Sequence, residues 1–257
     1  MLSSWAWAAY LSAAVVGEAL LPIIPAATAL IDAAVLVAAL TQFGLAQRSP
    51  LAMGDPGIRL LPAVALLPLL RLLSLTMPVP AFPSAAWIAL AGGPLLLAVP
   101  TAARLVVLSV GEMGLARWPR DLRSLGVVVL SIPVGLLVAG LAPAELGLPL
   151  ETPWMSGLVA FLVVSCAAVP EELIFRGMLQ PLVVRRVGVL GVALVAAVHA
   201  ATYIGTGSAP VVALVATMGL VYGFEVIRSR SIWAPMVGHS LMAVCATVIG
   251  PLILGSA

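Results

Sequence analysis

Charged residues are scarce in this sequence, and lysine is absent. Charged residues make up 9% of the 257 positions and hydrophobic residues 63%, whereas soluble domains carry roughly 25% charged residues. No polar stretch is long enough for a soluble domain, so we expect a single integral membrane domain. The net charge of +2 is too small to indicate binding to nucleic acid.

Cysteine is rare, and the N-terminus has no basic region. The two cysteines, Cys166 and Cys245, both lie in apolar runs, which excludes a disulfide framework. We interpret both as small core residues. The N-terminal stretch MLSSWAWAAYLSAAVV lacks the basic residues that begin a cleaved signal peptide. We therefore expect it to form the first spanning helix.

Long apolar segments fill most of the chain. Crossing a bilayer takes about 20 apolar residues, and about nine segments have that length. The sequence therefore predicts an all-α fold, a polytopic transmembrane helical bundle with about eight or nine spanning helices. Pro22 and Pro25 leave open whether the first two segments are separate helices, one broken helix or a re-entrant pair. The expected spans are 5–23, 26–46, 58–76, 86–109, 124–142, 155–175, 187–204, 210–227 and 232–254.

Arginine alternates between the loops. Arginines follow the second, fourth, sixth and eighth segments, while the loops around 77–85, 143–154 and 205–209 contain none. By the positive-inside rule, this pattern places the N-terminus and the arginine-rich loops in the cytoplasm. The stretch LGLPLETPW (146–154), flanked by Glu145 and containing Glu151, predicts a boundary. We expect an accessory bundle over 1–150 and a functional bundle over 151–257.

Ionisable residues inside the membrane cluster in the second bundle. Glu171, Glu172 and Arg176 occur together in the stretch PEELIFR, and the only two histidines, His199 and His239, lie inside later apolar segments. Such residues usually face the bundle interior and serve function. A helical rise of about 1.5 Å per residue lets all three segments bring these groups to a common depth. Glu18, Asp32, Arg71 and Arg104 lie in the first bundle, and no motif pairs them.

Helix spacing gives the two glutamates different roles. Glu172 and Arg176 are four residues apart and can pair on one helix face, whereas Glu171 is rotated away by about 100°. Pro170 favours the first turn of a helix, so we expect a helix break there that leaves the glutamates at a helix N-terminus. A carboxylate near a histidine can act as a general base. The structural alternative is that these groups only fasten helices together.

These residues resemble a known family. EELIFR is similar to the EExxxR motif of the CAAX-protease and bacteriocin-processing (CPBP or Abi) family of intramembrane proteases, which includes the type II CAAX prenyl endopeptidases. His199 lies where the second motif, FxxxH, would end, with Val195 in the place of its phenylalanine. His239 in RSRSIWAPMVGHS resembles the third motif. The resemblance covers about 155–250.

The resemblance implies an intramembrane endopeptidase. In that reading Glu171, assisted by His199, activates a water molecule that attacks a peptide carbonyl. His239 donates to the resulting oxyanion, and Glu172 and Arg176 orient the segment.

The third motif departs from the family at one position. Ala243 stands where the family usually has Asn or Asp. Losing one oxyanion donor costs about 10²–10³ in rate, unless Ser240 or a backbone amide replaces it.

A metal site is the main alternative mechanism. Glu171, His199 and His239 are also candidate ligands for Zn²⁺ with a water in an open position. There is no HExxH motif to decide between the two, and we favour the metal-free reading. There is also no GxSxG motif for a serine nucleophile.

Three functions compete. The first is a peptidase that acts on a leader peptide, a membrane protein or a prenylated peptide. The second is a catalytically impaired relative that serves as an immunity factor or scaffold. The third is a proton-coupled transporter, which the clustering of charges in one bundle and the lack of paired broken helices disfavour. In each case we expect a multi-pass protein in the lipid bilayer of a prokaryotic plasma membrane.

Overall fold

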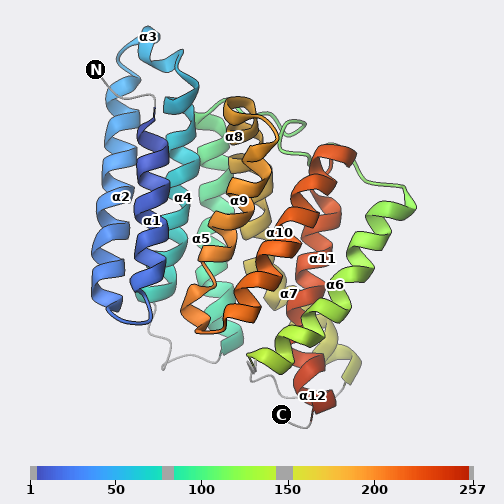
Figure 1. Ribbon diagram of the computed structural model, residues 1–257. Coiled ribbons are helices and arrows are strands. Elements are labelled where there is room, and N and C mark those ends of the chain that lie inside the picture. The colour runs from blue at the N-terminus through green and yellow to red at the C-terminus, as the bar shows by residue number, and fades with distance from the viewer. Residues whose placement is uncertain (1–4, 77–83, 143–152, 255–257) are drawn as a thin grey trace.

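The fold is a bundle of helices. The computed structural model describes residues 5–76, 84–142 and 153–254, and none of these residues lies in a strand, which confirms the all-α prediction (Figure 1). The predicted boundary near 150, with Glu145 and Glu151, lies outside the described residues. The elements of the N-terminal half are α1 (Ala6–Leu20), α2 (Pro25–Ala46), α3 (Pro50–Met53), α4 (Pro56–Thr76), α5 (Ser84–Leu105) and α6 (Leu122–Leu141).

The C-terminal half contains two segments of π-helix. Its elements are α7 (Pro153–Glu172), the π-helix η2 (Leu173–Leu179), α8 (Gln180–Val187), α9 (Leu190–Ala201), the 3₁₀ turn η3 (Ile204–Thr206), α10 (Ala209–Ser229), α11 (Trp233–Val244), the π-helix η4 (Cys245–Ile249) and α12 (Gly250–Leu254).

The described helices are long and apolar enough for a multi-pass membrane protein. Five stretches meet the length and hydropathy needed for a span, namely α2, α4, α6, α10 and the run Trp233–Leu254. Shorter apolar helices include α1 and the segments Leu90–Leu105 and Leu190–Thr206. At the two prolines the structure has two separate helices, since α1 ends at Leu20 and α2 begins at Pro25.

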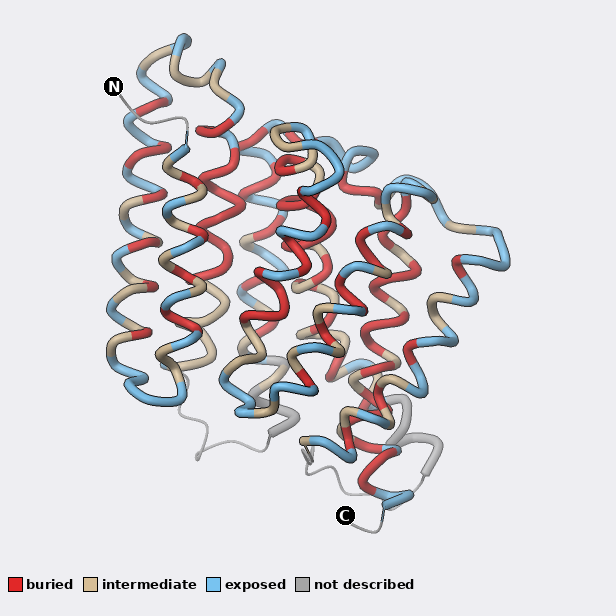
Figure 2. The backbone as a smooth tube through the Cα atoms, viewed as in Figure 1, coloured by how far each residue is buried: buried red, intermediate tan, exposed pale blue. Residues whose placement is uncertain are grey.

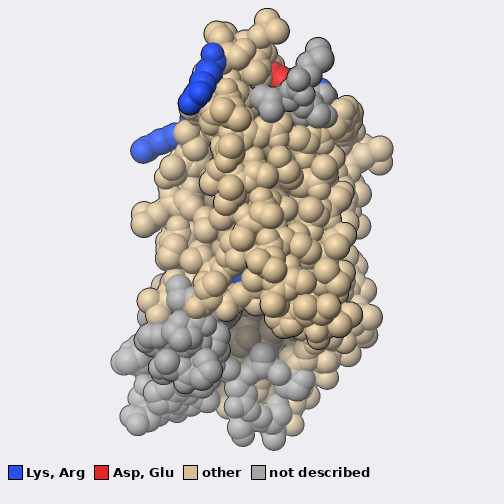
Figure 3. Space-filling view, turned by 90° about the vertical axis from the view of Figure 1, so that its left-hand side faces the viewer, with Lys and Arg blue, Asp and Glu red and all other residues tan. Residues whose placement is uncertain are grey.

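The arginine-rich loops gather at one end of the bundle. The connections α2–α4, α5–α6, α8–α9 and α10–α11 all lie at the upper end in Figure 1. On the face shown in Figure 3, the coloured basic residues concentrate at this end and most of the flank below is uncharged. We call the end that carries these four connections the arginine-rich end. Its orientation toward the cytoplasm stays a prediction.

A loop ion pair stabilises this end. In the α5–α6 connection, the Glu112 carboxylate accepts hydrogen bonds from the Ser109 N–H at 2.8 Å and the Ser109 hydroxyl at 2.7 Å. Arg185 at the end of α8 donates to the same carboxylate at 2.6 Å. The contact links the α5–α6 loop to the segment that follows the site.

One apolar core joins the two halves of the chain. In α4, every residue from Leu60 to Pro68 is buried (Figure 2). The same cluster of buried residues continues into η2 through Ile174 and Phe175 and into α9 through Val195. Helices from residues 1–142 therefore support the segment that carries the glutamates.

A polar contact also joins the halves. Arg71 of α4 pairs with Glu18 of α1, with Nε–Oε1 at 2.8 Å and Nη2–Oε2 at 2.5 Å. The same Nη2 donates to the carbonyl of Thr202, just after α9, at 2.7 Å. Three helices thus meet at one guanidinium, in a pairing that the sequence did not predict.

Candidate active site

The helix that carries the glutamates does not break at Pro170, so the predicted break is wrong. α7 continues through Pro170 to Glu172 and then widens into the π-helix η2. Proline cannot bond the carbonyl four residues earlier, and that carbonyl, of Cys166, lies against Gly92 of α5. A Cβ at Gly92 would overlap the Cys166 oxygen. A close neighbouring helix thus accommodates the proline, and the glutamates end α7 instead of beginning a helix.

Glu172 lies at the centre of a buried charge network. Its Oε1 is 3.3 Å from Arg176 Nη1, four residues later, and 2.9 Å from Nδ1 of His239 on α11. All three side chains are almost fully buried, with 0, 1 and 4% of their surface exposed. The predicted Glu172–Arg176 pair is therefore present. His239 is an additional partner that binds α11 to the same carboxylate.

Arg176 also determines which nitrogen of His199 carries a proton. Arg176 Nη1 lies 2.7 Å from Nδ1 of His199. Because a guanidinium only donates hydrogen bonds, Nδ1 must be the acceptor and hold no proton. His199 is then neutral with its proton on Nε2. This N–H faces Glu171, whose Oε2 is 3.3 Å away.

Glu171 is the accessible carboxylate of the site. Its side chain is 17% exposed, in contrast to the buried Glu172. Its Oε2 accepts from the hydroxyl of Tyr203 at 3.3 Å and lies 3.9 Å from Nε2 of His239. The structure thus brings together all five residues predicted from the sequence. Of the five, Glu171 has the most exposed side chain.

Two tyrosines of the site were not predicted. Tyr203 follows His199 by four residues, and this spacing was the available signal. The Tyr222 ring packs 5.9 Å from the Arg176 guanidinium and 6.5 Å from the His239 ring. Its hydroxyl lies 2.7 Å from that of Ser131 on α6. No sequence pattern pointed to Tyr222, because its role depends on contacts between helices.

The two residues that differ from the family motifs, Val195 and Ala243, both pack in apolar surroundings. Val195 is buried, and the aromatic contact to His199 comes instead from Phe175, whose ring centroid is 4.3 Å away. Ala243 packs beside an apolar cluster that includes Val164. The hydroxyl of Ser240 lies 3.0 Å from that of Ser165 on α7. These contacts place Ser240 at the α7–α11 packing surface.

The site also contains the candidate metal ligands. Glu171, His199 and His239 each offer a ligand atom, and these atoms lie within 4.8 Å of one another. A histidine that binds a metal through Nε2 normally donates its Nδ1–H to an acceptor. At His199 the Nδ1 position faces Arg176 Nη1, which is a donor. His239 fits a metal-binding histidine, because its Nδ1 faces a carboxylate, but His199 in this arrangement does not.

A cavity leads from the arginine-rich end toward the site. Its volume is about 700 Å³, and its lining runs from Arg185 and Arg230 past Gln180 to Arg176. The amide of Gln180 donates to the Gly223 carbonyl at 2.9 Å, which holds one wall in place. Of the five candidate site residues, Arg176 is the one that lines this cavity.

Comparison with known families confirms the resemblance. Residues 153–245 match the family described as type II CAAX prenyl endopeptidase Rce1-like. No curated protein and no solved structure matches the chain. The matched range contains all five candidate site residues. Together with the apolar helices, it indicates a multi-pass, CAAX-protease-like membrane peptidase that acts on a peptide substrate.

Proposed function

We propose that this protein is an intramembrane endopeptidase in which Glu171 activates water to hydrolyse a peptide bond. The observation that supports this proposal most directly is the environment of the Glu171 carboxylate. It is partly exposed, it accepts hydrogen bonds from His199 and Tyr203, and it has a second imidazole 3.9 Å away. These donors fix the carboxylate while leaving its other oxygen available as a general base.

The reaction follows from this geometry in two steps. Glu171 takes a proton from water, and the resulting hydroxide attacks the carbonyl carbon of the scissile peptide bond. The protonated Glu171 then gives its proton to the leaving nitrogen as the C–N bond breaks. The products are a carboxylic acid and an amine, and the carboxylate returns to its starting state.

His239 is placed to stabilise the oxyanion. Its Nδ1 lies 2.9 Å from Glu172 Oε1 and can donate to that carboxylate, and in the imidazolium form a second proton lies on Nε2, which is 3.9 Å from Glu171 Oε2. That N–H can donate to the negative oxygen of the tetrahedral intermediate. Glu172 and Arg176 act as positioning residues, since Glu172 contacts His239 and Arg176 contacts His199.

Two features support a mechanism without a metal. Arg176 faces Nδ1 of His199, where a metal-bound histidine would carry a proton. The remaining pair, Glu171 and His239, is one ligand short of the three protein ligands of a typical catalytic zinc site. Glu171 needs no metal to act as a base in this setting.

The first experiment measures peptide cleavage by the purified protein in detergent. Farnesylated, leader-type and unmodified peptides would be incubated with wild type, and fragments identified by mass spectrometry. Glu171→Gln should lower the cleavage rate by about 10²–10⁴. The matched control is Glu225→Gln, which alters a buried glutamate on α10 that pairs with Arg228 outside the site, and it should keep its activity.

Each contrary outcome has a definite meaning. Full activity in folded Glu171→Gln would refute the assignment of the base. Loss of activity with a chelator, restored by Zn²⁺, would refute the metal-free mechanism. If wild type cleaves nothing, Ala243→Asn becomes the deciding variant. Cleavage by Ala243→Asn alone would identify an impaired protease, and its continued inactivity would favour a scaffold or immunity protein.

A further inference from the structure

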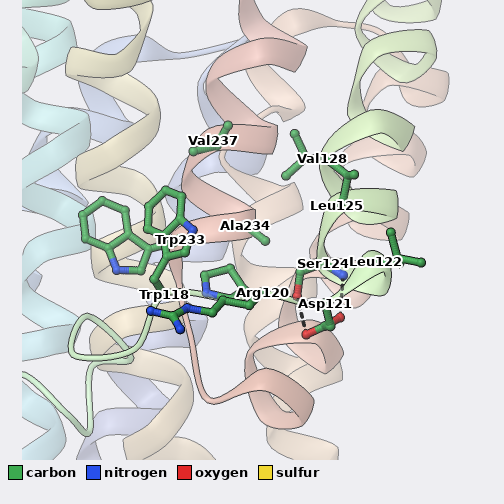
Figure 4. A pocket seen from close by; sticks show the side chains of 11 residues that line it. Trp118, Arg120, Asp121, Leu122, Ser124, Leu125, Val128, Trp233, Ala234 and Val237 are labelled. Carbon is green, nitrogen blue, oxygen red and sulfur yellow. Dashed lines mark hydrogen bonds between the residues drawn. The ribbon is translucent and has the colours of Figure 1, made fainter.

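A separate pocket opens between α6 and α11 at the arginine-rich end. Its volume is about 360 Å³, and Figure 4 shows its lining. The two helices meet closely deeper in the bundle, where a Cβ at Gly135 would overlap the Met242 carbonyl. Toward the arginine-rich end they diverge (Figure 1). The pocket is therefore a wedge that is widest at this end.

The walls of the wedge are apolar and its mouth is aromatic. Leu125 and Val128 of α6 face Ala234 and Val237 of α11 across the pocket (Figure 4). At the mouth, the rings of Trp118 and Trp233 lie 5.2 Å apart. Tryptophan is enriched where membrane proteins meet the lipid headgroups. This arrangement suits an amphiphile whose chain enters the bundle from the headgroup level.

The mouth also offers an uncompensated positive charge. Arg120 lines the pocket at the same end as the two tryptophans (Figure 4). Among the described residues it forms no hydrogen bond or ion pair. The adjacent Asp121 is already occupied, because it caps Ser124 at 2.9 Å and pairs with Arg228 at 2.8 Å. The charge at the mouth is complementary to an anionic headgroup.

The wedge is distinct from the candidate active site. Val237 faces α6, whereas His239, rotated by about 200° on the same helix, faces Glu172 of α7. The helix α11 itself therefore separates the two. A molecule in the wedge would contact no group of the charge network.

We propose that this wedge binds an anionic phospholipid, with its phosphate at Arg120 and one acyl chain between α6 and α11. The bilayer supplies such a molecule at the depth of the two tryptophans. Lipid binding in the wedge does not depend on whether the protein is a peptidase.

The test measures lipid retention by native mass spectrometry in neutral detergent. Phosphatidylglycerol, phosphatidylcholine and inorganic phosphate would each be titrated into wild type. We expect one phosphatidylglycerol to bind in preference to phosphatidylcholine, and phosphate alone to bind weakly. Arg120→Gln should bind phosphatidylglycerol about fivefold more weakly, and Val237→Trp should exclude it by filling the wedge.

A matched control and a competition complete the design. Arg48→Gln removes another exposed arginine at the same end and should bind as wild type does. Arg120 lies on the surface, so we expect the Arg120→Gln variant to fold. It therefore tests the proposal even if the Val237→Trp variant fails to fold. Equal binding by Arg120→Gln and wild type would overturn the proposal. So would displacement of phosphatidylglycerol by a farnesylated peptide, which would make the wedge a substrate site.

Discussion

Variants at Arg176 should show that the stability of the site and its activity depend on different contacts of this side chain. Arg176→Met deletes a guanidinium that is 1% exposed and pairs with the fully buried Glu172. The carboxylate would lose its partner of fixed charge while remaining buried. Methionine fills much of the same volume, so the change acts mainly on charge.

The expected cost follows from the burial of the pair. Breaking a buried ion pair by removing one partner costs about 3–5 kcal/mol. For a chain of this size, each kcal/mol lowers the melting temperature by about 2–4 °C. We therefore expect Arg176→Met to melt roughly 6–20 °C below wild type. The double variant Arg176→Met with Glu172→Gln removes both charges and should recover most of this loss.

The assay is thermal unfolding in detergent, followed by tryptophan fluorescence, with peptide cleavage measured on the same samples. Both variants should be inactive, because His199 loses the donor that fixes its proton and position. The reasoning is refuted if Arg176→Met melts like wild type. It is also refuted if the double variant is as unstable as the single one, because the cost would then not come from an unpaired carboxylate.

Three further predictions concern packing, the base and pH. Gly92→Ala should lower the melting temperature, because its Cβ would overlap a backbone carbonyl of α7, whereas Gly93→Ala, which meets nothing within 4 Å, should not. Tyr203→Phe removes a donor to Glu171 and should lower kcat about 10–100-fold with KM unchanged; an unchanged kcat would exclude this role. Hydrogen bonds from a neighbouring backbone N–H and hydroxyl, and then an arginine, lower the pKa of Glu112 from 4.5 to about 2. Its stabilisation is therefore complete above pH 4.5 and disappears as the pH falls through about 2, so Glu112→Gln should be less stable than wild type at pH 7, and the difference should vanish below about pH 2.

The sequence predicted what helix periodicity and composition control. The spans and the Glu172–Arg176 pair follow from rules local to one segment. Which histidine meets which glutamate does not follow from such rules, because it depends on how α7, α9 and α11 are rotated against one another, and only the family resemblance suggested the Glu171–His199 contact. The Arg71–Glu18 pair was unpredictable for the same reason. No periodicity relates a residue of α4 to one of α1.

The error at Pro170 has a similar origin. Proline alone favours a helix start, but a neighbouring glycine and the π-helix that follows let the helix continue. Such bulges frequently occur at functional sites. Here it carries Arg176 to His199 and to Glu172, which in turn contacts His239. The proline signal by itself could not indicate this outcome.

The proton positions of the two histidines test the metal-free site most directly. Glu171 can act as a base held by His199 only if Arg176 keeps Nδ1 of His199 unprotonated. Because the chain contains just two histidines, ¹⁵N-histidine labelling gives a simple NMR spectrum, and His239→Asn assigns it. We predict a neutral His199 at pH 7 with its proton on Nε2, and no change when a chelator is added. A proton on Nδ1 of His199, with Nε2 shifted by added Zn²⁺, would contradict the mechanism.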